Sequence, residues 1–151
     1  MVSKAMVSNQ SLYDRDFYAW ATEQASLLRA GRLAEADIPN IAEEIESMGR
    51  GEKRELVSRL TVLLVHLLKW GFQQEFRSRS WQSTIKEQRR KVIRHLGENP
   101  SLKPQMMECI ADAFESALVE IGVQTGIGEK FLPKSCPWTS EQLLDGEWFP
   151  E

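Results

Sequence analysis

The chain contains two arginine–histidine pairs whose residue types suit phosphate chemistry. Arg59 lies seven positions before His66, so on a helix both side chains would share one face, about 10 Å apart along the axis. Arg90 lies five positions before His95. A histidine can act as a general acid or base, and an arginine can stabilise the charge on a phosphate. His66 and Arg59 are therefore the candidate catalytic residues.

This spacing resembles the pattern of the HEPN class of helical ribonucleases, in which an Arg and a His act on RNA phosphate at a dimer interface. So loose a pattern also arises by chance, and the chain matches it twice. A simpler interpretation pairs Arg59 with Glu55, four positions earlier on the same helix. It leaves Arg90 and His95 on a solvated helix surface. A histidine without a catalytic role would be hydrogen-bonded at the edge of the core.

Carboxylates and a histidine also raise the question of a metal site. Glu43, Glu44 and His66 are the candidate ligands, with Glu46 close by. Di-iron helical bundles use Glu-x-x-His pairs that project both ligands from one helix. The position three before His66 is Leu63, and two histidines are too few for a three-histidine hydrolase site. A solvated acidic helix face is the favoured interpretation, and we expect no cofactor.

A basic segment runs from residue 77 to residue 95. It contains a single acid, Glu87, and one aromatic residue that could stack on a base. An acidic stretch from residue 35 to residue 46 carries no basic residue. Pairing of the two stretches, within the fold or across a dimer, is favoured over binding of nucleic acid or of an acidic protein partner. The candidate nucleic-acid contacts are Arg77, Arg79, Trp81, Lys86, Arg89, Arg90 and Arg94.

These residues are expected to lie on helices. The run Leu60–Phe72 is nearly all apolar but shorter than the roughly 20 residues that cross a bilayer. It predicts the buried end of a central helix over residues 52–72. Helical spacing predicts further helices over residues 14–30, 38–48, 81–96 and 104–121. The expected caps are Asp14 or Asp16, Asp37, Ser80 and Ser101, with a break at residues 49–51.

The sequence therefore predicts an all-α fold: a single-domain bundle of about five helices with a proline-rich C-terminal strap and a short terminal helix. The strap spans residues 129–151, and a capping box beginning at Thr139 places its helix at residues 140–144. Residues 1–12 are expected to be a flexible tail and residues 13–151 one domain. The 151 residues, net charge of −3 and 42% hydrophobic content are ordinary for a soluble domain. Cys109 and Cys136 are expected to be reduced thiols in a cytoplasmic protein.

Several motifs occur in a fixed order along the chain. They include residues 13–20 (YDRDFYAW), 40–46 (NIAEEIE), 66–70 (HLLKW) and 136–137 (CP). The series resembles the bacterial domain-of-unknown-function family number twenty-nine, from about Tyr13 to Pro150. The resemblance implies a compact all-helical domain that is common in photosynthetic bacteria. It implies no established activity, cofactor or catalytic residue.

These residues are compatible with a non-catalytic and with a catalytic role. We favour a cytoplasmic module that binds another protein or a second copy of itself, without catalysis and without a membrane. The alternative is a nucleic-acid-binding protein that uses the basic fourth helix, with HEPN-like cleavage by Arg59 and His66 as one version. A third interpretation is a metal site at Glu43, Glu44 and His66.

Overall fold

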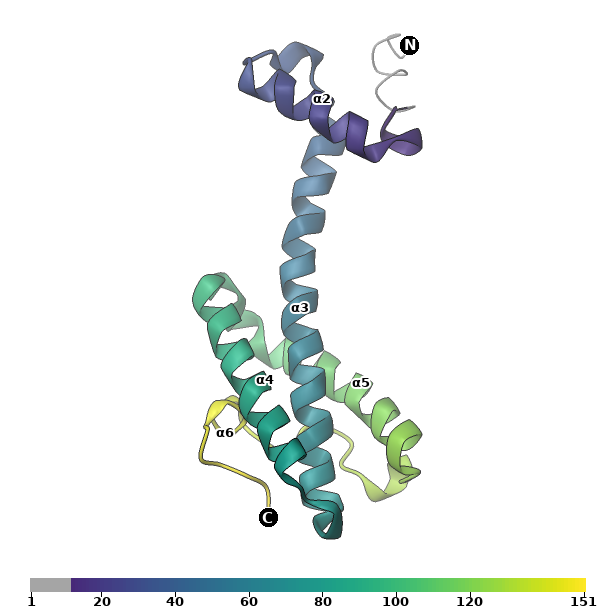
Figure 1. Cartoon of the computed structure of the whole chain (residues 1–151), viewed down its shortest axis with the longest axis vertical. Coiled ribbons are helices and arrows are strands. Elements are labelled where there is room, and N and C mark those ends of the chain that lie inside the picture. The colour runs from purple at the N-terminus through teal and green to yellow at the C-terminus, as the bar shows by residue number, and fades with distance from the viewer. Residues whose placement is uncertain (1–11) are drawn as a thin grey trace. The chain divides into compact units, whose positions relative to one another are not determined.

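The computed structural model describes residues 12–151, and these residues form helices and loops without a β-strand (Figure 1). The predicted all-α class is confirmed. The predicted N-terminal tail, apart from residue 12, lies outside the described residues. The chain divides into two units, one ending at Arg50 and the other comprising Gly51–Glu151. A single domain over residues 13–151 remains a prediction.

The first unit begins with a helical turn over residues 12–15 and continues with α2, Phe17–Arg29. Asp16 caps α2, because its Oδ1 accepts a hydrogen bond from the backbone N–H of Ala19 at 3.0 Å. The helix ends before Gly31, whose φ of 72° lies in the left-handed region that glycine adopts without strain. A 3-10 turn, η1 (Leu33–Glu35), leads to the next helix.

Helix α3 runs without interruption from Ile38 to Phe72, and the boundary between the units falls within it (Figure 1). The predicted break at residues 49–51 is wrong. A glycine inside a helix costs only about 0.5–1 kcal/mol relative to alanine. Arg50 offsets part of this cost, because its guanidinium reaches Glu43 at 2.9 Å and Glu46 at 3.8 Å on the preceding turns.

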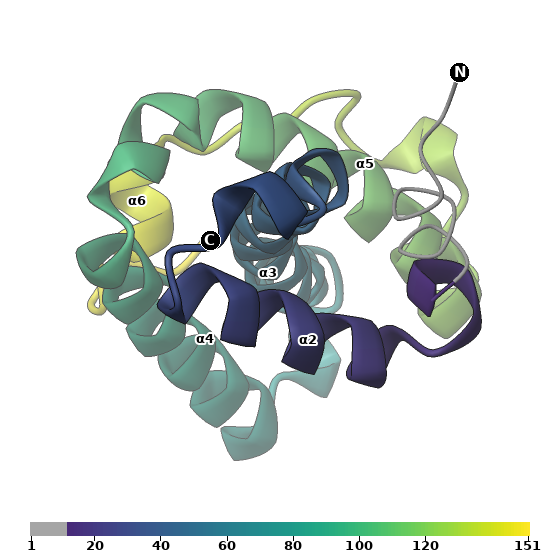
Figure 2. The same cartoon turned by 90° about the horizontal axis from the view of Figure 1, so that it is seen from above.

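The second unit is built around the C-terminal part of α3, which α4, α5 and α6 surround (Figure 2). Helix α4 spans Arg79–Glu98, and a 3-10 segment, η3 (Pro100–Gln105), connects it to α5, Met106–Thr125. The leucines of the apolar run predicted as the centre of the fold are buried, whereas Phe72 at its end is exposed. The buried leucines are Leu60, Leu63, Leu64, Leu67 and Leu68, together with Leu56 on the preceding turn.

Two boundaries of α4 and α5 follow from local capping. Ser78, not the predicted Ser80, caps α4, because its hydroxyl accepts a hydrogen bond from the N–H of Trp81 at 3.2 Å. A 3-10 turn, η2 (Gln74–Phe76), separates this cap from α3. Helix α5 ends at Gly126, with a φ of 76°. Ser101 lies inside η3 and caps no α-helix.

The C-terminal segment contains a 3-10 turn, η4 (Glu129–Phe131), and a short helix, α6, at Ser140–Leu144, as the sequence predicts. Thr139 and Gln142 form the predicted capping box, with bonds of 3.1 and 2.9 Å. Leu132 and Leu143 are buried in the core of the second unit. Cys109 and Cys136 are free thiols, and burial raises the pKa of both.

Candidate functional site

The first unit is held together by one polar cluster between α2 and the start of α3. Trp20 is buried, and its Nε1–H donates to Oδ2 of Asp37 at 3.0 Å. Gln24 is also buried, and its Oε1 accepts a hydrogen bond from the backbone N–H of Asp37 at 2.7 Å. Asp37 in turn accepts from the side chain of Asn40 at 2.8 Å. Its Oδ1 also accepts from the backbone N–H of Asn40 at 3.5 Å, so this carboxylate caps α3 and fixes α2 beside it.

A second contact joins the helical turn at residues 12–15 to α3. The hydroxyl of Tyr13 donates to Oε1 of Glu44, and this bond with the nearby carboxylates raises the pKa of Tyr13 to about 12. The ring of Tyr13 meets that of Trp20 edge to face, with centroids 4.7 Å apart. Phe17 packs on the same pair of rings. The side of α3 that carries Glu44 is therefore in contact with Tyr13 of the same unit.

The neighbouring edge of α3 is apolar and exposed. Ile38, Ile41, Ile45 and Met48 are spaced by three, four and three residues, which places them within an arc of about 80°. We call these four residues the α3 seam. Ile45 is 58% exposed and Met48 65% exposed, and Ile38 is exposed as well. Alternating spacings of three and four are typical of a helix that packs against another helix.

The charged residues beside the seam are paired within the helix. Arg50 binds both Glu43 and Glu46, and Glu44 accepts the hydrogen bond of Tyr13. The acidic face predicted from the sequence is thus partly neutralised by its own helix.

The candidate catalytic pair has ordinary structural partners. Arg59 forms an ion pair with Glu55, with Nε and Oε1 2.9 Å apart, as the simpler interpretation predicts. Nδ1 of His66 lies 2.9 Å from the backbone oxygen of Val62 and donates its proton there. Burial lowers the pKa of His66, and the ammonium of Lys69 acts in the same direction. At neutral pH the imidazole is therefore uncharged and held by its own helix.

The metal candidates have other hydrogen-bond and ion-pair partners. Glu43 and Glu44 belong to the first unit and His66 to the second, with the partners just described. Within residues 12–151, no three His, Cys, Asp or Glu residues form a group that could hold a metal ion. The geometry therefore adds nothing in favour of the metal interpretation.

Two arginines of the basic segment are engaged inside the second unit. Arg89 is buried, donates to the backbone oxygens of Leu143 at 2.8 Å and Gln142 at 3.4 Å, and lies over the ring of Phe149. Arg77 donates to the backbone oxygen of Trp70 at 2.8 Å and stacks on its ring. Arg89 cannot present its guanidinium to a nucleic acid, and Arg77 is committed to Trp70. Both belong to the packing of the fold.

The other candidates of the basic segment are more accessible. Arg79, Lys86, Arg90 and Arg94 are exposed on α4. Trp81 is half-buried, and the ammonium of Lys69 lies 5.6 Å from its ring centre. Arg90 pairs with Glu87 and Arg94 with Glu98, so these charges are partly compensated by their own helix. The basic segment therefore offers fewer unpaired cations for binding a nucleic acid than its sequence indicates.

Two features of the first unit were not recognised from the sequence alone. Sequence reasoning assigned no role to Trp20, Gln24 and Asp37 together, because their contact joins residues far apart along the chain. It predicted a helix over residues 38–48 but not that the apolar face of this segment is exposed. The signal for the second point was present in the three–four–three spacing.

None of the helices in residues 12–151 combines the length and apolarity needed to cross a membrane. Comparison with curated proteins and with solved structures gave no match. The family model described as "Domain of unknown function DUF29" matches residues 12–149, nearly the whole chain. This match confirms the resemblance carried by the ordered motifs. The chain therefore belongs to the DUF29 family of domains of unknown function.

Proposed function

We propose that this protein is an interaction module that associates with a second copy of itself through the α3 seam. The observation that carries the proposal is the exposure of Ile38, Ile45 and Met48 on one face of a continuous helix. Large apolar side chains gathered on one face commonly mark a protein–protein contact. The proposed role requires no catalytic step.

The first unit has little core of its own. Among its described residues only Trp20 and Gln24 are buried, and one of these two is polar. Units of this size seldom bury enough apolar surface to be stable alone, and association is one way in which they gain it. Pairing with a second copy would add the seam to this minimal core.

The partner proposed for the α3 seam is the same seam of a second copy. Two identical seams are complementary by construction, because a two-fold axis brings each apolar position opposite another. Ala42 and Gly49 lie beside the seam and leave room for a closely packed helix, since no side chain or backbone approaches within 4 Å of a Cβ built at Gly49. The pairing of Glu43 and Glu46 with Arg50 reduces the charge repulsion between two such helices.

Substitutions at the seam test which face is used. Ile45→Glu and Met48→Glu together should abolish self-association measured by light scattering. In a two-fold interface each substitution occurs in both copies, so it buries two charges. Val123→Glu is the matched control, since Val123 is exposed on α5 of the second unit. Circular dichroism checks that helix content is unchanged. Association that survives the double substitution, or that the control disrupts equally, would refute the assignment of the seam.

A further inference from the structure

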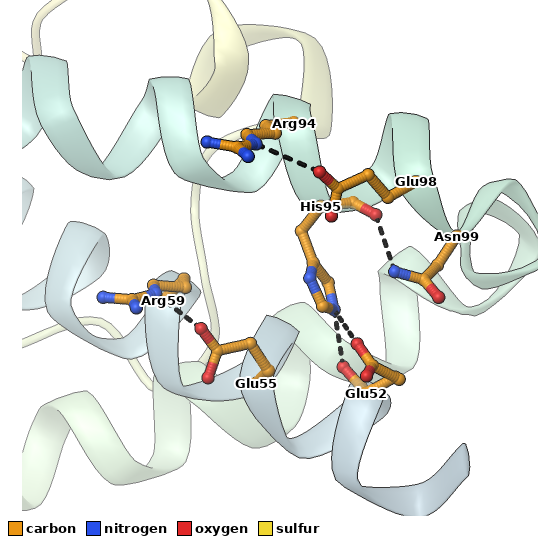
Figure 3. A network of polar contacts seen from close by, with 7 residues as sticks. All are labelled: Glu52, Glu55, Arg59, Arg94, His95, Glu98 and Asn99. Atoms are coloured by element: carbon orange, nitrogen blue, oxygen red, sulfur yellow. Dashed lines mark hydrogen bonds and ion pairs between the residues drawn. The ribbon is translucent and has the colours of Figure 1, made fainter. Parts of the chain in front are cut away.

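A polar groove lies between α3 and α4 within the second unit, independent of the α3 seam (Figure 3). Its walls carry four basic side chains, Arg59 from α3 and Arg90, Lys91 and Arg94 from α4. His95, Glu55 and Glu98 complete the lining, and Glu87 pairs with Arg90 and Lys91 on the same helix. The cavity measures about 230 Å³, which leaves room for an anion with several water molecules.

The base of the groove is fixed. His95 projects from α4 toward α3, as Figure 3 shows, and its side chain is only 12% exposed. Its Nε2 lies 2.8 Å from the backbone oxygen of Glu52 and 3.5 Å from the carboxylate of the same residue. The side chain of Asn99 donates to the backbone oxygen of His95 at 3.1 Å. The two helices are therefore joined at this point, and the spacing of the cations above it is set by the fold.

Arg59 and Arg94 each pair with a carboxylate that a bound anion could replace. Nε of Arg59 binds Glu55 at 2.9 Å, and Nε of Arg94 binds Glu98 at 3.0 Å. Each guanidinium has terminal N–H donors besides Nε, in the fork geometry that suits phosphate. Glu55, Arg94 and Glu98 have largely exposed side chains, and ion pairs exposed to water contribute little to stability. Exchange of a carboxylate for a phosphate group is therefore energetically accessible.

We infer that this groove is a phosphate-binding site, in which Arg59, Arg90, Lys91 and Arg94 bind the phosphate group of a nucleotide or of a nucleic-acid backbone. Arg59 of α3 and the two arginines of α4 meet here in one cavity. The site uses binding alone and assigns no catalytic step to His95. It does not require self-association, so either proposal can fail without the other.

The test measures binding of inorganic pyrophosphate and of a short single-stranded RNA to the full chain by calorimetry. Arg90→Ala with Arg94→Ala should weaken binding at least about tenfold, because two of the four cations are lost. The matched control is Arg79→Ala with Lys86→Ala, which removes the same charge from the same helix outside the groove. It should change the affinity for pyrophosphate less than about twofold.

A third variant tests the role of the acidic partner. Glu55→Gln removes the carboxylate that competes for Arg59 and should strengthen binding several-fold. Tight binding of pyrophosphate itself would identify a small phosphorylated ligand, and much tighter binding of RNA would identify a backbone phosphate. No binding of either probe by the wild-type protein would overturn the site. Equal weakening in the control pair would also overturn it, since it would show diffuse attraction to the whole helix.

Discussion

The indole N–H of Trp20 donates to the carboxylate of Asp37 at 3.0 Å, across the turn that joins α2 to α3. The other oxygen of this carboxylate accepts from the backbone N–H of Asn40 at 3.5 Å in the first turn of α3, so one side chain contacts both helices. Trp20 is buried in this contact. The geometry of the first unit, and with it the presentation of the α3 seam, therefore depends on Asp37.

Asp37→Ala should destabilise the first unit by about 2–3 kcal/mol. The substitution removes a helix cap and leaves the buried N–H of Trp20 without an acceptor. Amide hydrogen exchange should show faster exchange in α2, residues 17–29. Asp14→Ala is the control, because Asp14 is an exposed carboxylate of the same unit. Equal exchange in both variants would show that Asp37 does not hold α2.

Arg89→Met should release the C-terminal segment from the second unit. The variant keeps an unbranched side chain but loses the donors to Leu143 and Gln142, and hydrogen bonds from a charged group contribute about 1.5–3 kcal/mol. Limited proteolysis should cut the segment around α6 faster than in the wild type. Lys86→Met, at an exposed position of the same helix, should leave the cleavage rate unchanged. Indistinguishable rates in the two variants would contradict an anchoring role for Arg89.

Gly49→Ala should stabilise the protein by about 0.5–1 kcal/mol. Gly49 lies inside the continuous helix α3 with open space around it, and alanine is the better helix former. Gly126→Ala should have the opposite effect, because its φ of 76° is strained for any residue with a Cβ. Thermal unfolding of the two variants measures both changes in stability. A loss of stability in Gly49→Ala would indicate a true break in α3, as the sequence predicts.

The stability of the second unit should fall in mild acid because of His66. Its folded pKa lies below the ordinary value of 6.5, so at intermediate pH the unfolded chain binds more protons. The contribution of neutral His66 to the free energy of unfolding is therefore complete above about pH 6.5. It is lost as the pH falls toward the pKa of His66 in the folded state. Urea unfolding between about pH 5 and 7.5 should show a smaller pH dependence in His66→Gln than in the wild type. Identical curves would exclude His66 as the source.

Much of the fold was readable from local chemistry. The Asp16 cap, the stop at Gly31, the capping box at Thr139 and the buried run from Leu60 depend on residues close together in the sequence. The break at residues 49–51 was predicted wrongly because glycine propensity was weighed without the ion pairs of Arg50. The cap of α4 was placed at Ser80 because several serines compete there, and only the backbone geometry selects Ser78.

The candidate sites were less predictable, because they depend on contacts between helices. The pairing of Arg59 with Glu55 follows from a spacing of four residues, and the sequence predicted it. The burial of Arg89 could not be foreseen, since its acceptors lie on a segment more than fifty residues away. The convergence of Arg59 with Arg94 likewise requires the packing of α3 against α4. Long-range packing of this kind leaves no periodic signal in the chain.

Self-association of the wild-type chain is the central claim, and the most direct test is its mass by sedimentation equilibrium over a series of concentrations. A chain of 17.3 kDa that pairs through the α3 seam should approach twice this mass as the concentration rises. This rise in mass with concentration should disappear in the Ile45→Glu and Met48→Glu double variant. A wild-type mass that stays at 17.3 kDa at every concentration would contradict the account.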